Sequence, residues 1–99
     1  MSKRYPVLSN ELGDLECEIS KEGLFFLHLS LKKWNKTLYK QSLIYFYSWL
    51  NMLYESGVLA VFVLIPEDDK KLYKFEQMFG FEEIDRKNGL ILMAQGTGD

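Results

Sequence analysis

The sequence predicts a single mixed α/β domain in which a central pair of parallel strands has antiparallel strands on either side. Polar and apolar side chains alternate through residues 14–32 around a short turn, which is typical of two strands. Residues 38–56 have the apolar spacing of a helix, and residues 58–65 form a continuous apolar run. Because 99 residues suffice for one domain only, we expect one unit over 1–99, with 1–13 an N-terminal arm and 95–99 a flexible tail.

The first two strands are expected at residues 14–20 and 24–32. Leu15, Cys17 and Ile19 fall on one face of the first strand, and Lys21-Glu22-Gly23 forms a turn. The short turn makes the pair an antiparallel hairpin. Large apolar side chains stand on both faces of the second strand near its start, so we expect that strand inside the sheet.

A long helix is expected over residues 38–56. Either Asn35 or Thr37 is suited to cap its first turn, and Gly57 is suited to end it because glycine accepts a left-handed backbone. A helical spacing directs four side chains toward a core: Leu43, Phe46, Leu50 and Leu53.

The second half of the chain predicts strand, helix and hairpin. The apolar run 58–65 is expected to be buried on both faces, as parallel strands are. The acidic residues 67–69 suit the positive end of a second helix, which runs to about Phe79 and is closed by Gly80. Strands at 81–86 and 90–94 then join through Asn88-Gly89, so the expected order is β-β-α-β-α-β-β.

Composition excludes several classes of protein. The single cysteine cannot form an intramolecular disulfide, and one cysteine with one histidine cannot build a common zinc site. The polar start predicts no signal peptide, and the longest apolar run is too short for a membrane span. A net charge of −2 gives no global reason to expect nucleic acid. We therefore expect a cytoplasmic protein with no nucleic-acid, membrane or metal partner.

The segment 75–84, FEQMFGFEEI, together with LILM at 90–93, resembles the late helix, the Gly-Phe and the last hairpin of the GNAT (GCN5-related N-acetyltransferase) superfamily. The element order over residues 15–94 is similar to that fold with its N-terminal strand and helices removed. A second resemblance, to small acetyltransferase-like proteins of tailed bacteriophages, rests on the short lead into the helix, which is rich in Lys, Trp and Asn.

Two departures from the GNAT pattern concern the site that the resemblance implies. The superfamily holds the pyrophosphate of coenzyme A in a glycine-rich turn, where backbone N–H groups reach the phosphates. Residues 30–38 contain no glycine and include the bulky Trp34. Glu76 stands where the superfamily often has a general-acid tyrosine, and Tyr73 is about one helical turn away. We therefore predict no catalytic residue, with Tyr73 and Glu76 the candidates for that role.

Each candidate site has an ordinary structural alternative. Lys32, Lys33, Lys36 and Lys40 are either an anion site or a solvated edge, and if coenzyme A binds, the resemblance places its phosphates against a set of five residues: Lys32, Lys33, Asn35, Lys36 and Thr37. His28 is either a general base or a packed or edge histidine, since nothing near it in the sequence completes a catalytic set.

Other polar groups are expected to be structural. Cys17 is interpreted as a buried thiol. The acidic residues 67–69 are interpreted as caps and dipole partners of a helix, and Glu82, Glu83 and Asp85 as exposed strand positions.

The helix 38–56 is apolar over most of its circumference, which indicates that more than one side is covered. One interpretation is an interface with a protein partner or a second copy, centred on Tyr45, Trp49 and Met52. The other is that the second helix and the N-terminal arm cover these side chains.

Two classes of function follow. The first is a non-catalytic acetyltransferase-like scaffold without a cofactor, which acts as a protein-binding or assembly component, phage-encoded and associated with the virion or the host cytoplasm. The alternative is a minimal N-acetyltransferase that uses acetyl-CoA held between strands 24–32 and 58–65. A third class, nucleic-acid binding, is supported by the lysines of residues 32–40 and opposed by the acidic net charge.

Overall fold

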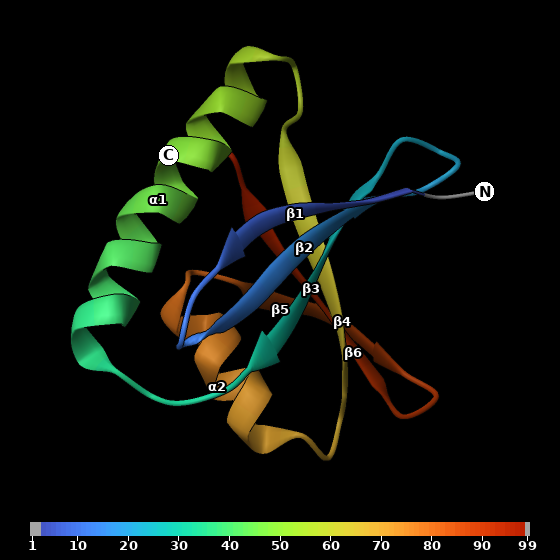
Figure 1. Cartoon of the computed structure of the whole chain (residues 1–99). Helices are drawn as coiled ribbons and strands as arrows, with labels where there is room; N and C mark the ends of the chain where they lie inside the picture. The colour runs from blue at the N-terminus through green and yellow to red at the C-terminus, as the bar shows by residue number, and fades with distance from the viewer. Residues whose placement is uncertain (1–2, 99) are drawn as a thin grey trace.

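A computed structural model describes residues 3–98 as one mixed sheet with two helices (Figure 1). In chain order the elements are β1 (Lys3–Ser9), β2 (Gly13–Ile19), β3 (Phe25–Leu31), α1 (Lys36–Glu55), β4 (Ala60–Pro66), α2 (Lys70–Met78), β5 (Glu82–Lys87) and β6 (Leu90–Gly96). The six-stranded sheet has the order β1-β2-β3-β4-β6-β5. The mixed α/β class predicted from the sequence is therefore confirmed.

The sheet consists of two antiparallel parts that meet at one parallel contact. β1, β2 and β3 pair antiparallel on one side, and β4, β6 and β5 on the other. β3 and β4 pair in parallel with Phe26 opposite Phe62 as their register. This confirms the expected central parallel pair and the interior position of β3.

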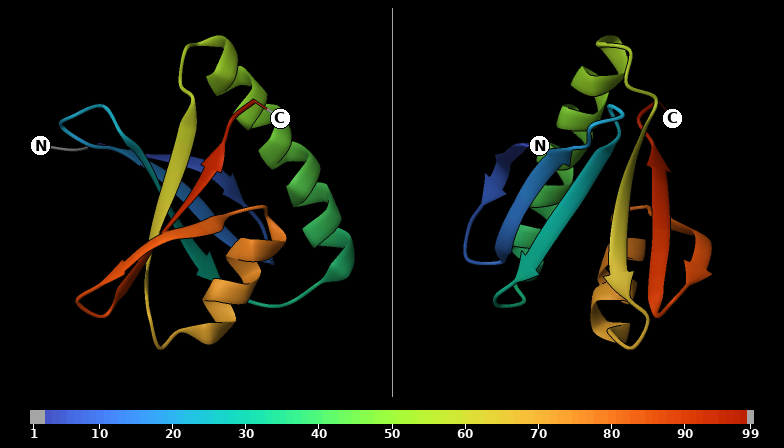
Figure 2. Two further views of the ribbon diagram at one scale, coloured as in Figure 1. Left: turned by 180° about the vertical axis from the view of Figure 1, so that it is seen from behind. Right: turned by 90° about the vertical axis from the view of Figure 1, so that its right-hand side faces the viewer.

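Both helices lie on the same face of the sheet, as the two views in Figure 2 show. We call this the covered face, and the opposite one the open face. Side chains on a strand alternate between faces, so Leu15 and Cys17 of β2 point to the covered face while Glu16 and Glu18 point to the open face. The open face carries no helix from residues 3–98.

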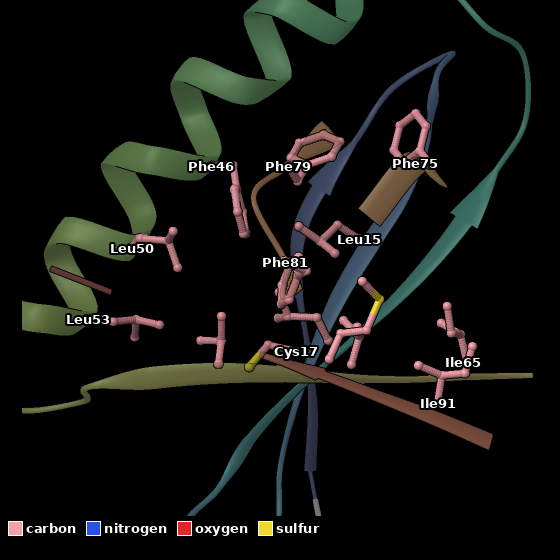
Figure 3. Close-up of a cluster of buried hydrophobic side chains, with 14 of the residues drawn as sticks. Leu15, Cys17, Phe46, Leu50, Leu53, Ile65, Phe75, Phe79, Phe81 and Ile91 are labelled. Carbon is pink, nitrogen blue, oxygen red and sulfur yellow. The ribbon is translucent and has the colours of Figure 1, made fainter. Parts of the chain in front are cut away.

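The core fills the space between the covered face and the helices (Figure 3). Phe46 of α1 is at its centre, with the rings of Phe79 and Phe81 at 5.4 and 6.1 Å. The buried hydrophobic side chains are Leu12, Leu15, Cys17, Leu27, Phe46, Leu50, Leu53, Val61, Val63, Ile65, Phe75, Phe79, Phe81, Ile91 and Met93. Of the predicted helix stripe, Phe46, Leu50 and Leu53 are buried and Leu43 is partly buried.

The helix ends follow the residues that the sequence suggested. The side chain of Asn35 accepts a hydrogen bond from the backbone N–H of Leu38 at 3.0 Å, so Asn35 is the N-cap of α1. Asp69 caps α2 in the same way through Leu72.

Gly80 explains the Gly-Phe motif. Its φ of +103° is strained for other residues, and a Cβ there would lie 2.6 Å from the side-chain nitrogen of Gln95. Only glycine fits this turn, which directs Phe81 into the core.

Two predictions about the chain ends are wrong. The expected arm contains β1, which pairs with β2 and makes the sheet six-stranded, so the order begins β-β-β. The expected tail is held through residue 97, because Thr97 is buried and its backbone N–H donates to the carbonyl of Leu59 at 3.0 Å. Of the predicted arm and tail, residues 1–2 and 99 lie outside the described residues.

The expectation that 58–65 is buried on both faces is also wrong. Val61, Val63 and Ile65 are buried on the covered face, whereas Leu64 on the open face is 52 % exposed. The apolar run reflects a strand in the middle of the sheet, but only one of its faces has helices over it. Within residues 3–98, neither helix is long and apolar enough to cross a membrane.

Candidate functional site

The end of β3, the segment that follows it and one side of α2 line an open, largely apolar pocket of about 410 Å³, which we call the basic pocket. Its lining residues are Leu12, Leu31, Lys32, Lys33, Trp34, Lys71, Lys74, Phe75 and Met78. Lys32 and Lys33 were anion-site candidates from the sequence. The fold adds Lys71 and Lys74, which sequence reasoning missed, although their spacing of three on α2 places them on one side of that helix with Phe75.

Trp34 forms one wall of the basic pocket. Its ring centre lies 5.4 Å from that of Tyr39 and 6.1 Å from that of Phe75, which it meets edge to face. The side chain is nevertheless 54 % exposed. The tryptophan therefore joins the start of α1 to α2 and still presents aromatic surface to solvent.

The five residues proposed for the phosphates of coenzyme A do not form one site. Lys32 and Lys33 line the basic pocket, whereas Asn35 and Thr37 line a separate open hollow. That hollow includes Glu11, whose charge opposes an anion. Lys36 is exposed at the start of α1, and Asn35 already uses its side-chain oxygen to cap the helix.

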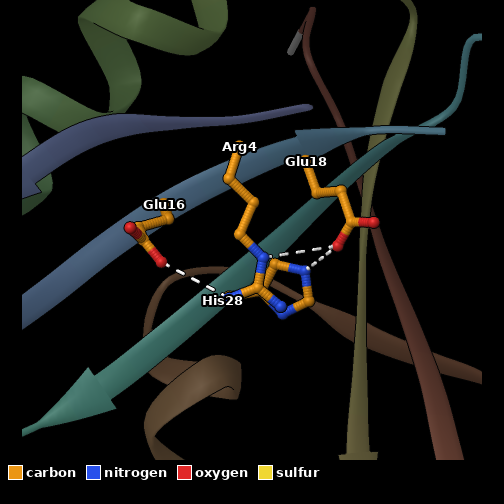
Figure 4. Close-up of polar contacts among 4 residues, drawn as sticks. All are labelled: Arg4, Glu16, Glu18 and His28. Atoms are coloured by element: carbon orange, nitrogen blue, oxygen red, sulfur yellow. Dashed lines mark hydrogen bonds and ion pairs between the residues drawn. The ribbon is translucent and has the colours of Figure 1, made fainter. Parts of the chain in front are cut away.

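Four polar side chains form a cluster on the open face, which we call the open-face cluster (Figure 4). His28 Nε2 lies 2.7 Å from Glu18 Oε1. Arg4 from β1 reaches the same oxygen of Glu18 at 3.6 Å and Oε1 of Glu16 at 3.5 Å. A carboxylate on one imidazole nitrogen fixes the orientation of the ring and its tautomer.

The open-face cluster gives His28 the partner that the sequence did not reveal. Glu18 is ten residues earlier on β2, and the hairpin register brings it diagonally across from His28. His28 shares its face with Phe26, whose ring lies 5.7 Å from that of Phe62 on β4. The pair is thus close to the parallel contact between the two parts of the sheet.

Tyr73 and Glu76 do not share a site. The Tyr73 hydroxyl donates to Glu83 Oε1 at 3.0 Å on β5, and this hydrogen bond raises the pKa of the tyrosine. Arg86 binds both oxygens of the same carboxylate at 2.8 and 3.1 Å. Tyr73 is therefore held toward an edge strand, in a small network that is exposed to solvent.

Glu76 is buried in the covered face with only 4 % of its surface exposed. Burial raises the pKa of its carboxyl group to about 8, so the group carries a proton at neutral pH. A buried carboxyl group with a shifted pKa is a feature of functional sites as well as of strained cores. It stays a candidate acid.

α2 covers one side of the aromatic helix α1. The hydroxyls of Tyr39 and Tyr47 donate to the carbonyls of Met78 and Phe79 at 2.8 and 3.3 Å, which fixes both tyrosines against the end of α2.

The other side of α1 is left uncovered by residues 3–98. Ile44, Tyr45 and Met52 are 71, 50 and 54 % exposed, and we call these three side chains the outer face of α1. Trp49, predicted with them, is partly buried and packs 6.1 Å from the ring of Phe46. Ile44 was missed, although the helical spacing from Phe46 and Leu53 places it on the opposite side of α1.

The remaining candidates are structural. Cys17 is buried, as predicted, and burial raises the pKa of its thiol to about 11. Asp69 is a helix cap, and Glu82, Glu83 and Asp85 are exposed on β5, also as predicted. Within residues 3–98, no three His, Cys, Asp or Glu side chains gather closely enough to hold a metal ion.

Comparison with solved structures identifies the kind of fold. The crystal structure of a protein named SsHAT superposes with a TM-score of 0.62 at 24 % identity, over 76 % of this chain and 37 % of that one. A GNAT-family acetyltransferase from Listeria monocytogenes superposes with a TM-score of 0.59 at 20 % identity, over 86 % of this chain and 57 % of that one.

The class defined by these likenesses is an acetyltransferase-like GNAT fold, as the sequence resemblance implied. This chain spans 37 and 57 % of the two proteins' lengths, so it is similar to part of each. No protein-family model matches the chain, and no curated protein sequence matches it either.

Proposed function

We propose that the chain is a non-catalytic acetyltransferase-like domain that acts as an assembly component by pairing with a second copy through the outer face of α1. The observation that carries the proposal is that Ile44, Tyr45 and Met52 stay exposed although α2 and β1 are both in place. Of the two interpretations of the aromatic helix, internal covering accounts for Tyr39 and, in part, for Tyr47 and Trp49. Exposed apolar side chains gathered on one helix are typical of a protein contact.

The region around the start of α1 supports the absence of acetyl transfer. The connection between β3 and α1 has no glycine, and the backbone N–H of Leu38 is already bound by Asn35. Trp34 fills space beside this turn, where a phosphate cradle needs backbone groups to be open. A helix start with these features offers few N–H groups to a pyrophosphate.

A second copy of the chain is the partner that best fits the outer face of α1. Its three side chains carry no charge, and a chain with a net charge of −2 has little long-range repulsion from its own copy. Tyr45 and Met52 are seven residues apart, two turns along one side of the helix. Two such helices related by a two-fold axis would bury both pairs. The phage resemblance would place this assembly in a virion.

Sedimentation equilibrium across a wide range of protein concentration tests the proposal. We expect a reversible dimer whose dissociation constant rises at least about tenfold in Tyr45→Glu and in Met52→Glu, because each places a charge in the interface. Tyr5→Glu changes an exposed tyrosine on β1 and is the matched control, with no expected effect. A wild-type chain that stays monomeric at the highest concentration would refute the dimer.

A second candidate function, acetyl-CoA-dependent N-acetyl transfer, is favoured by one specific observation, the His28–Glu18 pair at 2.7 Å. With Nε2 held by Glu18, His28 would take a proton from the acceptor amine at Nδ1, and the amine would then attack the thioester carbonyl and release the thiol. Lys32 and Lys33 at the basic pocket would face the phosphates.

Calorimetry with acetyl-CoA separates the two functions. Binding at micromolar to millimolar ligand, with acetyl transfer to a primary amine that falls at least about a hundredfold in His28→Gln, would support the enzyme. An absence of heat and of any thermal shift at millimolar acetyl-CoA would leave the non-catalytic assembly domain.

A further inference from the structure

The basic pocket brings four of the twelve lysine and arginine residues of this acidic chain together. Four of its lining side chains are lysines, and none of the described residues that line it is acidic. Lys32 has Asp14 as a partner at 3.2 Å, whereas Lys33, Lys71 and Lys74 have no carboxylate within salt-bridge distance among residues 3–98. The net charge of −2 therefore conceals a local site for anions.

The basic pocket also has an aromatic and apolar interior. Trp34 and Phe75 meet edge to face in its wall, and Leu12, Leu31 and Met78 complete it. At about 410 Å³ it lies within the range of roughly 300–1,000 Å³ that is usual for ligand pockets. A ligand that fits must combine negative charge with a flat or apolar group.

We propose that the basic pocket binds single-stranded nucleic acid, with phosphates on Lys33, Lys71 and Lys74 and a base against the exposed surface of Trp34. Single-strand sites combine a positively charged groove with an aromatic side chain on which a base stacks. Exposed Lys36 and Lys40 follow Trp34 in the first turns of α1 and add positive charge at that end of the helix. The expectation of no nucleic-acid partner rested on net charge alone.

Other anionic macromolecules fit the basic pocket less well. A membrane surface would contact the exposed lysines, but Phe75 beside them on α2 is buried and cannot enter lipid. The carboxylates of an acidic peptide would pair with the lysines, but such a peptide need not supply a flat ring to stack on Trp34. The pocket lies apart from the outer face of α1, so binding here and dimer formation can fail independently.

Fluorescence anisotropy with a labelled oligo-dT of about 12 nucleotides, and with oligo-U of the same length, tests the proposal on the full chain. We expect binding at low salt that weakens between about 50 and about 200 mM salt. For three phosphate contacts, the slope of log K against log salt is about −2. Quenching of Trp34 fluorescence in a Trp49→Phe background is expected to follow the same binding curve.

Two kinds of variant separate charge from stacking. Lys71→Gln and Lys74→Gln should each weaken binding and reduce the magnitude of the salt slope by about 0.7, whereas Lys21→Gln, in the turn at the opposite end of β3, should change neither. Trp34→Leu should weaken binding about tenfold and Trp34→Phe should retain most of it, because only phenylalanine keeps a ring. Tyr5→Ala, at an exposed tyrosine on β1, is the aromatic control outside both the basic pocket and the outer face of α1.

Three results would overturn the proposal. The first is absence of binding at low salt by a folded wild-type chain. The second is displacement by inorganic polyphosphate as strong as by oligo-dT, with Trp34→Leu unchanged, which would mean attraction by charge alone. The third is binding of coenzyme A more tightly than of either oligonucleotide, which would assign the pocket to the second candidate function.

Discussion

The two faces of the sheet show how one set of strands serves two purposes. On the covered face, Leu15, Cys17 and Val63 are buried beneath α1 and α2. On the open face, the alternate residues of β2, Glu16 and Glu18, are partly exposed. Alternation of side chains assigns each residue to a face, and only the presence of helices decides which face becomes the core.

This contrast separates stability from candidate chemistry. Apolar burial on the covered face supplies the driving force for folding. The open-face cluster and the outer face of α1 lie outside the core, where substitutions cost little stability and where partners have access. Substitutions on the covered face should therefore lower stability, whereas substitutions on the open face should mainly change function.

The largest expected effect is the loss of Phe46 on the covered face. Phe46→Ala should lower the free energy of unfolding by about 3–5 kcal/mol, because the ring is 1 % exposed and lies against Phe79 and Phe81. Phe62→Ala is the matched change on the open face, where the ring is partly exposed, and should cost about 1 kcal/mol. Urea denaturation of both variants measures the difference, and equal losses would mean that the open face is covered in solution.

The fold was predictable wherever the signal is local. Alternation gave the β2–β3 hairpin, helical spacing gave α1, and Asn88-Gly89 marked the last turn. β1 was missed because Pro6 and the charged residues at its start are unfavourable in strands. The segment forms a strand because it pairs with β2. The exposure of β4 on the open face was missed for a similar reason, since a sequence does not state how many helices cover a strand.

The second prediction concerns Glu76, the polar group inside the covered face. Its folded pKa of about 8 lies above the ordinary value of 4.5, so between these values the folded state holds a proton that the unfolded state has lost. The bound proton's contribution to the free energy of unfolding is therefore complete at acid pH. It decreases as pH rises, by about 3 kcal/mol between about pH 5.5 and about pH 8. Urea denaturation across this range measures the decrease.

Glu76→Gln removes the titrating group and keeps the shape. In that variant the free energy of unfolding should change far less with pH, so the substitution stabilises the protein at pH 8 relative to the parent. Glu16→Gln on the open face, an exposed carboxyl group, is the control and should leave the pH dependence of the parent intact. A parent profile that stays flat from pH 5.5 to 8 would show that Glu76 is hydrated or paired in solution.

The candidate sites depend on contacts that a sequence does not contain. Lys32 and Lys33 were visible as a cluster, but Lys71 and Lys74 join them only because α2 packs beside the end of β3. His28 looked isolated because its partner Glu18 lies across a strand pair. The sequence shows which residues could bind or catalyse, whereas only the folded structure shows which of them are neighbours in space.

The smallest expected effect on stability is the loss of the His28–Glu18 pair. Because both side chains are partly exposed, at 38 and 26 %, His28→Gln should change the free energy of unfolding by less than about 1 kcal/mol. Glu18→Gln also removes the partner of Arg4, so the double variant isolates the coupling between His28 and Glu18. A coupling above about 2 kcal/mol, measured by urea denaturation of the four proteins, would mean that this cluster is part of the folding core. A small coupling would leave the pair available for function, which is what the contrast between the two faces predicts.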